Sequence, residues 1–367
     1  MNGELEMKSI ALAAAAAAAL LACPAVAQDA PQWSLAIHGG AGVIERAQLS
    51  PERDAAYRAG LQAAPDAGSA VLARGGSSLD AVQAAIEVME ENPLFNAGRG
   101  AVFTSAGKNE LDAAVMDGTD LNAGAVAGLT RTRHPIAAAR AVMEKSPHVM
   151  LIGEGAETFA RSAGLEEVAP SFFFTESRWQ ALLKALRDRG EPLPPRPEGA
   201  PPEPARLGPA APLAFNLHEA PLDERKFGTV GAVAVDSQGR LAAGTSTGGT
   251  TAKRWGRVGD VPIIGAGTYA SNADGCAVSA TGTGEYFIRA TVARDICRRT
   301  AEGATVQAAA DAEIAEVGNI GGDGGVIVMG KDGVHAFSMN TSGMYRGAVS
   351  STSPARVAIY GDEAGAR

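Results

Sequence analysis

Aromatic residues and cysteine are scarce in this sequence, and acidic residues outnumber basic ones. Aromatic residues make up 5% of the 367 residues, cysteine occurs three times, and 32 Lys+Arg stand against 41 Asp+Glu, which leaves a net charge of −9. Proteins that bind nucleic acid or an anionic membrane surface need concentrated Lys and Arg. The composition therefore excludes nucleic acid and membrane as expected partners.

Local metal and disulfide motifs are also missing. The five histidines include no pair within five positions, which excludes a histidine-based zinc site of the usual local spacing. Of the three cysteines, Cys23 lies in the N-terminal apolar segment. Cys276 and Cys297 can form one disulfide or remain two free buried thiols, and the sequence leaves both states open.

Glycine is the residue in excess. It occupies 45 of 367 positions, about 12%, against an average of roughly 7%. No G-X-Y period is present, which excludes collagen. The excess predicts many tight turns and many places where the backbone closely approaches another group.

The N-terminus predicts an export signal. Lys8 is followed by an apolar run over residues 10–23 and then by Pro24-Ala-Val-Ala27, the order of a charged region, an apolar region and a small-residue cleavage site. The run is shorter than the roughly 20 residues of a membrane-spanning helix. We expect cleavage after Ala27 and a periplasmic or secreted protein. Leu20-Leu-Ala-Cys23 resembles a lipobox, so a lipoprotein anchored at Cys23 is the alternative.

Apolar spacing and breaker residues predict the elements. A strand is expected at residues 33–37, with a loop at 38–42, a helix at 50–72, and a second helix capped by Ser78 and ended by Pro93. Nine of the 20 prolines lie between residues 191 and 212, which predicts an extended segment. Further helices are expected at 137–144, 156–163, 178–188 and 286–299, and strands at 101–103, 113–117, 324–329 and 334–337.

A β-hairpin is predicted from Thr229 to Thr247. Two β-compatible runs flank Ser237-Gln-Gly239, a three-residue loop with glycine where a left-handed residue is required. If Asp236 faces Arg240, then Thr229 lies opposite Thr247. Two threonine hydroxyls would thus meet at the open end of the hairpin, although Thr–Thr pairs are also ordinary sheet content.

The residues before Thr229 indicate self-cleavage. The proline-rich segment leads into Gly228, and glycine permits a strained backbone next to a hydroxyl nucleophile. Attack of the Thr229 hydroxyl on the Gly228 carbonyl would release a new N-terminal threonine. Its α-amine, with a reference pKa of about 8, can serve as general base for the hydroxyl of the same residue. This chemistry requires no histidine.

Nine motifs in order resemble the plant-type L-asparaginase/isoaspartyl aminopeptidase family of N-terminal-nucleophile hydrolases. Together they cover most of the chain. They are IHGGAG (37–42), NPLFNAGRG (92–100), ELDAAVMDG (110–118), PHVML (147–151), GTVGAV (228–233), STGG (246–249), GRVGD (256–260), TGTGE (281–285) and NTSGMYR (340–346).

The resemblance implies an α+β fold, a four-layer αββα sandwich, made from two chains of one domain. Cleavage between Gly228 and Thr229 would give an α chain of residues 28–228 and a β chain of residues 229–367, which would assemble as an (αβ)2 heterotetramer. The implied substrates are the side-chain amide of L-asparagine and β-aspartyl dipeptides, hydrolysed through a β-aspartyl ester on Thr229.

The resemblance also implies roles for individual residues. Thr229 is the expected nucleophile and Thr247 the threonine that orients it. The remaining expected residues are Thr281 and Gly282 for the oxyanion hole, Arg257 and Asp260 for the α-carboxylate and α-ammonium of the substrate, Gly284 for the ammonium, and Asn96 as support for the nucleophile.

A loop near the end of the second predicted helix resembles the structural Na⁺ site of the family. No metal or organic cofactor is implied in the chemistry itself. Arg99 stands where the family often has an aliphatic residue, a departure that is harmless if only its carbonyl binds. The expected ligands are the backbone carbonyls of Met89, Glu90, Asn92, Phe95, Ala97 and Arg99.

Several alternatives stay open at this point. A glycosylasparaginase-like activity on glycan-bearing asparagine is disfavoured by Gly228, because those precursors commonly carry Asp there. A non-cleaving binding protein on the same scaffold is a different class. Arg257 with Asp260 could be a surface salt bridge, and Thr281 with its glycines only a turn. We interpret His38 and its glycines as mainly structural, and the glycines at 321–325 as a turn.

Overall fold

The computed structural model describes residues 32–203 and 228–363. The predicted leader, its cleavage point after Ala27, the alternative anchor Cys23 and residues 204–212 of the proline-rich segment lie outside this part of the chain. Within the described residues, no helix is long and apolar enough to cross a membrane.

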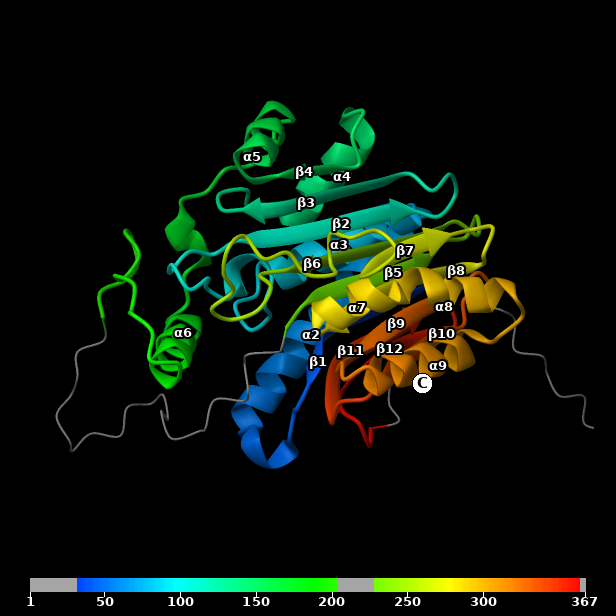
Figure 1. The fold of residues 1–367 in the computed structure, drawn as a ribbon. Helices are drawn as coiled ribbons and strands as arrows, with labels where there is room; N and C mark the ends of the chain where they lie inside the picture. Colours follow the sequence, from blue (N-terminus) through cyan, green and yellow to red (C-terminus); the bar gives the residue numbers. More distant parts are fainter. Residues whose placement is uncertain (1–31, 204–227, 364–367) are drawn as a thin grey trace, which may run out of the picture. The chain divides into compact units, whose positions relative to one another are not determined.

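Two β-sheets form the middle of the fold (Figure 1). The larger sheet has the strand order β12-β11-β1-β5-β6-β2-β3-β4, and the smaller has the order β10-β9-β8-β7. The strands are β1 (Ser34–Gly42), β2 (Leu111–Asp117), β3 (Ala123–Leu129), β4 (Met150–Ile152), β5 (Val230–Val235), β6 (Leu241–Thr247), β7 (Thr268–Ser271), β8 (Cys276–Gly282), β9 (Gly324–Gly330), β10 (His335–Met339), β11 (Gly343–Ser350) and β12 (Ser353–Tyr360).

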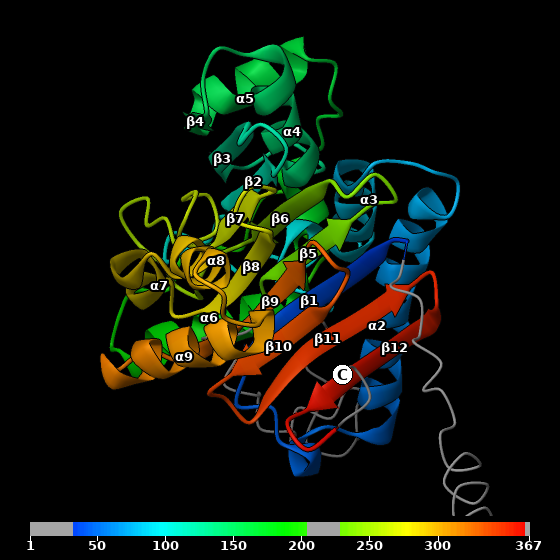
Figure 2. The same ribbon diagram turned by 90° about the vertical axis from the view of Figure 1, so that its right-hand side faces the viewer.

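Helices cover the outer face of each sheet. Helices α2, α3 and α4 pack on one face of the large sheet, the small sheet packs on its other face, and α8 and α9 lie outside the small sheet (Figure 2). This arrangement confirms the expected α+β class and αββα layering. The helices are α2 (Pro51–Leu72), α3 (Ser78–Glu90), α4 (Pro135–Lys145), α5 (Gly153–Ser162), α6 (Glu176–Asp188), α7 (Gly284–Ala290), α8 (Val292–Ala301) and α9 (Val306–Asn319), with short 3-10 turns η1 (Arg46–Gln48), η2 (Gly98–Gly100) and η3 (Pro170–Phe173).

Successive side chains of β1 pack alternately into the two hydrophobic cores, which joins the layers. Leu35 and Ile37 belong to the apolar core under α2 and α3, whereas Ala36 belongs to the core between the two sheets. Successive side chains of a strand point to opposite faces, so a central strand between two cores is buried at every position. All nine residues of β1 are buried accordingly.

The first helices confirm most of the predicted boundaries. Helix α2 begins after Ser50, whose side chain accepts a hydrogen bond from the Arg53 N–H. The predicted cap of α3 is wrong by one residue, because Ser77 has the extended backbone of a cap and accepts from the Asp80 N–H. The Ser78 N–H instead donates to Asp236 Oδ2 at 3.0 Å.

Two segments differ from the expected strand and loop pattern. Residues 38–42 continue strand β1 and do not form a loop, because β11 lies beside this entire segment and β5 extends as far as His38, with one register irregularity between His38 and Gly40. The strand expected at 101–103 is absent apart from a single bridge between Phe103 and Asn109.

The helix predicted over 286–299 is two helices. Helices α7 and α8 meet at Thr291, whose φ is 53°. The start of α8 is also bound to the loop before β7, since the N–H groups of Ala293 and Arg294 donate to the carbonyls of Ala266 and Gly265 at 3.1 and 2.8 Å. Helix α9 was not predicted, although its buried residues follow a helical spacing after the Thr305 cap.

The remaining expectations concern cysteine and proline. Cys276 in β8 and Cys297 in α8 form a disulfide, so the free-thiol alternative is wrong. Both residues are fully buried in the core between the sheets and α8. Residues 191–203, the described part of the proline-rich segment, contain neither helix nor strand, as expected.

Candidate active site

The β5–β6 hairpin brings Thr229 and Thr247 together. Its register pairs Val230 with Ser246 and Val235 with Leu241, which confirms the pairing predicted from the turn. The two threonine hydroxyl oxygens lie 3.0 Å apart. Thr247 Oγ1 also accepts a hydrogen bond from the Gly249 N–H at 3.0 Å, which leaves its hydrogen able to point at the Thr229 oxygen.

Gly228 occupies a conformation and a space that only glycine fits. Its φ is +121°, and a Cβ built on it would lie 2.5 Å from Asn96 Cβ. A Cβ on Gly40, whose φ is +113°, would lie 2.5 Å from the Gly228 nitrogen. The peptide bond predicted to be cut is therefore confined between two backbones, and its carbonyl accepts from the Asn96 N–H at 2.9 Å.

Asn96 ties the loop before η2 to both ends of the hairpin. Its amide nitrogen donates to the Gly249 carbonyl at 2.7 Å, and its Oδ1 accepts from the Val102 N–H at 2.9 Å. The Asn96 carbonyl accepts from the Gly248 N–H at 3.0 Å. Asn96 is 2% exposed, and its hydrogen bonds hold the residue before Thr229 and the two residues after Thr247.

His38 holds the backbone of Thr229. Its Nδ1 lies 3.0 Å from the Thr229 carbonyl oxygen, and its Nε2 lies 2.9 Å from Ser279 Oγ. Burial lowers the pKa of His38 to about 3, so the ring is neutral. A neutral ring satisfies both contacts only when Nδ1–H donates to the carbonyl and Nε2 accepts from Ser279. His38 thus contacts Thr229, the expected nucleophile, a contact that the sequence did not predict.

A row of hydroxyl groups continues from His38 into the space between the sheets. Ser279 Oγ lies 2.7 Å from Thr245 Oγ1, which in turn lies 2.7 Å from Thr268 Oγ1. All three residues are buried. The sequence carried a signal for two of them, because Thr245 and Ser279 stand two positions before Thr247 and Thr281 and therefore share a strand face with them.

Thr281 and Gly282 lie at the end of β8. Thr281 is 1% exposed, and its Oγ1 accepts from the Ala41 N–H at 3.4 Å. Among the described residues, no acceptor is found for the Thr281 hydroxyl hydrogen. A buried donor of this kind can stabilise a developing oxyanion.

Arg257, Asp260 and Gly284 converge at one point. A Cβ built on Gly284 would lie 2.7 Å from Asp260 Oδ1 and 3.1 Å from Arg257 Nη2. The Arg257 guanidinium forms a two-point ion pair with the Glu285 carboxylate, at 2.9 and 3.0 Å. A surface salt bridge between Arg257 and Asp260 is therefore not what the structure contains.

The Asp260 carboxylate is buried without a full set of partners. Asp260 is 5% exposed, and its Oδ2 has no hydrogen-bond partner among the described residues. Burial raises the pKa of this carboxyl to about 7. An ammonium group next to it would supply the missing partner and favour the ionised form.

Comparison with known proteins identifies the family. A family model described as "Asparaginase" matches residues 31–359 of this chain. The chain belongs to the asparaginase family. It is 49% identical to "Isoaspartyl peptidase" of Escherichia coli (strain K12) over 85% of this chain and 91% of that protein. It is 39% identical to "Isoaspartyl peptidase/L-asparaginase" of Xenopus laevis over 86% and 91%, and 41% identical to "Plant-type L-asparaginase" of Pyrococcus furiosus over 85% and 94%.

In the loop of this asparaginase-family chain that is expected to bind Na⁺, backbone carbonyl oxygens lie very close to two glycine residues. A Cβ on Gly98 would lie 2.4 Å from the Glu90 carbonyl oxygen, and one on Gly100 would lie 2.0 Å from that of Phe95. The Arg99 guanidinium lies 5.5 Å from the ring centre of Phe172. The loop thus offers the uncharged oxygen donors that suit an alkali cation.

Three of the other four expected carbonyls already accept backbone hydrogen bonds. Those of Met89, Asn92 and Ala97 accept from the N–H groups of Asn92, Phe95 and Gly100, at 3.2, 3.2 and 3.1 Å. Each carbonyl oxygen has a second lone pair, so these bonds do not prevent cation binding.

Two buried carboxylates near Thr247 were not predicted as parts of the site. The Glu90 side chain accepts from Ser246 Oγ at 2.6 Å, and burial raises its pKa. Asp112 lies opposite Thr247 in the β2–β6 ladder, and its Oδ2 is 3.8 Å from Lys253 Nζ. The Glu90 carboxylate thus holds the side chain next to Thr247, whereas the Asp112 Oδ1 accepts a hydrogen bond from the Gly128 N–H at 2.9 Å.

Proposed function

We propose that this chain cleaves itself between Gly228 and Thr229 and then hydrolyses β-aspartyl amides, namely the side chain of L-asparagine and isoaspartyl dipeptides. The observation that carries the proposal is the 3.0 Å contact between the Thr229 and Thr247 hydroxyls directly after a glycine with a φ of +121°. The names of the similar proteins, isoaspartyl peptidase and isoaspartyl peptidase/L-asparaginase, support the same substrates.

Self-cleavage is an N-to-O acyl shift. Thr229 Oγ1 forms a bond to the Gly228 carbonyl carbon, the peptide C–N bond breaks, and the nitrogen takes the proton of the hydroxyl. The Asn96 N–H polarises this carbonyl, and Thr247 orients the hydroxyl. Water then hydrolyses the ester, which leaves the Gly228 carboxylate and the free α-amine of Thr229.

In substrate hydrolysis, Thr229 Oγ1 again attacks a carbonyl carbon, here the β-carbonyl carbon of the substrate. The α-amine takes the proton of Thr229 Oγ1 while this oxygen attacks the β-carbonyl carbon of the substrate. Thr281 Oγ1–H and the Gly282 N–H would stabilise the oxyanion. The leaving amine takes the proton from the α-amine, and water, activated by the same amine, hydrolyses the β-aspartyl ester to aspartate.

Arg257 and Asp260 supply specificity for an α-amino acid. A guanidinium binds a carboxylate through two hydrogen bonds, as Arg257 does here with Glu285. The substrate's α-carboxylate would take the place of the Glu285 carboxylate, which is on an exposed side chain. The α-ammonium would bind to Asp260.

The proposal is tested by intact mass and turnover. Wild-type protein should yield two chains that separate at Gly228/Thr229 in denaturant and should hydrolyse L-Asn and β-Asp-Leu. Thr229→Ala should remain one chain without turnover, whereas Thr119→Ala, at an exposed turn, should behave as wild type. A single uncut wild-type chain contradicts self-cleavage. Turnover confined to a glycosylated asparagine contradicts the proposed substrates.

We also propose that the loop of residues 89–99 binds a structural Na⁺ through its backbone carbonyls. Sodium at about five times its Kd would add about 1 kcal/mol to the free energy of unfolding. The Tm should therefore be higher in NaCl than in choline chloride at equal ionic strength. Gly98→Ala, which places a Cβ against the Glu90 carbonyl, should abolish that difference. Equal Tm values in both salts for the wild type contradict a Na⁺ site.

Export and assembly are proposals as well. We propose that residues 1–27 direct export with cleavage after Ala27, and the Cys276–Cys297 disulfide supports an oxidising compartment. A diacylated Cys23 in the mass spectrum of the mature protein would show the lipoprotein alternative. We propose that the two chains assemble as (αβ)2, which light scattering of the mature protein tests: a mass of one αβ unit contradicts it.

A further inference from the structure

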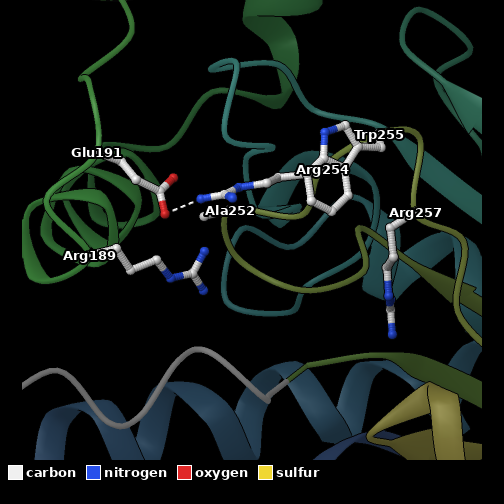
Figure 3. Close-up of a pocket in the computed structure, with 6 residues that line it drawn as sticks. All are labelled: Arg189, Glu191, Ala252, Arg254, Trp255 and Arg257. Atoms are coloured by element: carbon white, nitrogen blue, oxygen red, sulfur yellow. Dashed lines mark ion pairs between the residues drawn. The ribbon is translucent and has the colours of Figure 1, made fainter.

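A cavity of about 420 Å³ lies beside Arg257 (Figure 3). One wall comes from the residues that follow helix α6, and the other comes from the loop after β6. The lining residues are Arg189, Glu191, Ala252, Arg254, Trp255 and Arg257. We call it the α6 cavity.

The α6 cavity is positively charged in a chain that is acidic overall. It contains three guanidinium groups and one carboxylate. Glu191 forms an ion pair with Arg254 that joins the two walls (Figure 3), and Arg257 pairs with Glu285 outside the lining. Within residues 32–203 and 228–363, Arg189 has no carboxylate partner. The cavity therefore favours an anionic ligand.

Trp255 adds an apolar surface at the edge of the cavity. Its side chain is 95% exposed, and its φ is +55°, a left-handed conformation that is costly for a bulky residue. The Arg254 guanidinium lies 5.7 Å from the ring centre. An exposed ring held next to a guanidinium can contact the apolar part of a ligand whose anionic group binds the arginine.

Arg257 connects the α6 cavity with the candidate active site. Its Nη2 is 3.1 Å from a Cβ built on Gly284, the position that is also 2.7 Å from Asp260 Oδ1. A substrate bound by its α-carboxylate and α-ammonium at Arg257 and Asp260 therefore lies at the edge of the cavity. L-Asn releases ammonia and has nothing to place in it, whereas a β-aspartyl dipeptide releases an amino acid with its own carboxylate.

We propose that the α6 cavity is a subsite for the leaving residue of isoaspartyl dipeptides. Arg189 and Arg254 bind the α-carboxylate of that residue, and Trp255 contacts its side chain. The subsite rests on the proposed hydrolase function and specifies its preferred substrate class: dipeptides with a free carboxylate on the leaving residue. It also gives the residues after helix α6 a role in substrate binding.

The test compares three substrates: β-Asp-Leu, its C-terminal amide β-Asp-Leu-NH2, and L-Asn. The amide lacks only the negative charge that the subsite recognises. We expect wild-type kcat/KM for β-Asp-Leu to exceed that for the amide about tenfold, the size of one charge-assisted hydrogen bond. Arg189→Gln and Arg254→Gln should each reduce the ratio of kcat/KM for the acid to that for the amide several-fold.

Arg187→Gln is the matched control, because Arg187 is exposed on the same helix end and does not line the cavity. It should retain the wild-type ratio. Equal wild-type values for acid and amide overturn the subsite, as does an equal loss on all three substrates in Arg189→Gln. Absence of any hydrolysis by the wild type overturns the hydrolase proposal itself, so the two failures are distinct.

Discussion

The Asp260 carboxylate should control how substrate capture depends on pH. Burial raises its pKa to about 7 in the free protein, and the proposed role requires the ionised form to bind the substrate's ammonium. About 9% of such a group is ionised at pH 6 and about 91% at pH 8. We therefore expect the ionisation of Asp260 to contribute about a tenfold rise in kcat/KM for L-Asn from pH 6 to pH 8.

The pKa of Asp260 should differ between the free enzyme and the enzyme–substrate complex, and this difference tests its role. A bound ammonium stabilises the carboxylate, so the pKa of Asp260 falls when substrate is bound. The value of kcat reports groups in the enzyme–substrate complex, and kcat/KM reports groups in the free enzyme. The pH profile of kcat/KM should thus rise with a midpoint near pH 7, the limb due to Asp260. In the pH profile of kcat the same limb should have its midpoint at lower pH. The α-amine of Thr229, with a reference pKa of about 8, affects both parameters.

Two variants complete the assay. Asp260→Asn should lower kcat/KM at pH 8 and remove the limb near pH 7, because its side chain does not titrate. Asp120→Asn, at an exposed turn, should retain both. The reasoning is refuted if Asp260→Asn keeps the wild-type pH profile, or if the limb near pH 7 has the same midpoint in kcat and in kcat/KM.

Three further outcomes follow from the site and the core. Thr247→Ala should slow turnover about 100-fold in steady-state assays while Thr247→Ser restores most of it; an active alanine variant would remove the hydroxyl from the mechanism. Gly228→Ala should slow maturation, followed by gel over time, because its Cβ would lie 2.5 Å from Asn96 Cβ; cutting at the wild-type rate would contradict the need for glycine. The pair Cys276→Ser/Cys297→Ser should lose about 3 kcal/mol of unfolding free energy in urea denaturation, since the disulfide spans 21 residues; an unchanged midpoint would contradict it.

Local chemistry made the hairpin predictable. Asp236 and Gly239 define a turn in which the Gly239 φ is +72° and the Asp236 N–H donates to the Arg240 carbonyl at 3.1 Å. This turn sets the register of both strands, and the register brings Thr229 to Thr247. The predicted secondary structure was wrong where pairing with a distant strand determines the conformation. Residues 38–42, for example, were predicted as a loop but belong to β1, which pairs with β11 and β5.

The sequence by itself determined the hairpin register that pairs Thr229 with Thr247, because turn residues act over short stretches of chain. The layered fold class and the candidate substrate clamp were implied by the resemblance of the ordered motifs to a known family. Only the tertiary structure decided that His38 holds the Thr229 carbonyl through a ring bound to Ser279, that Asp260 is buried with a raised pKa, and that the end of α6 forms a cationic cavity beside Arg257. These features depend on burial and on contacts between residues far apart in the chain, which arise when the layers pack.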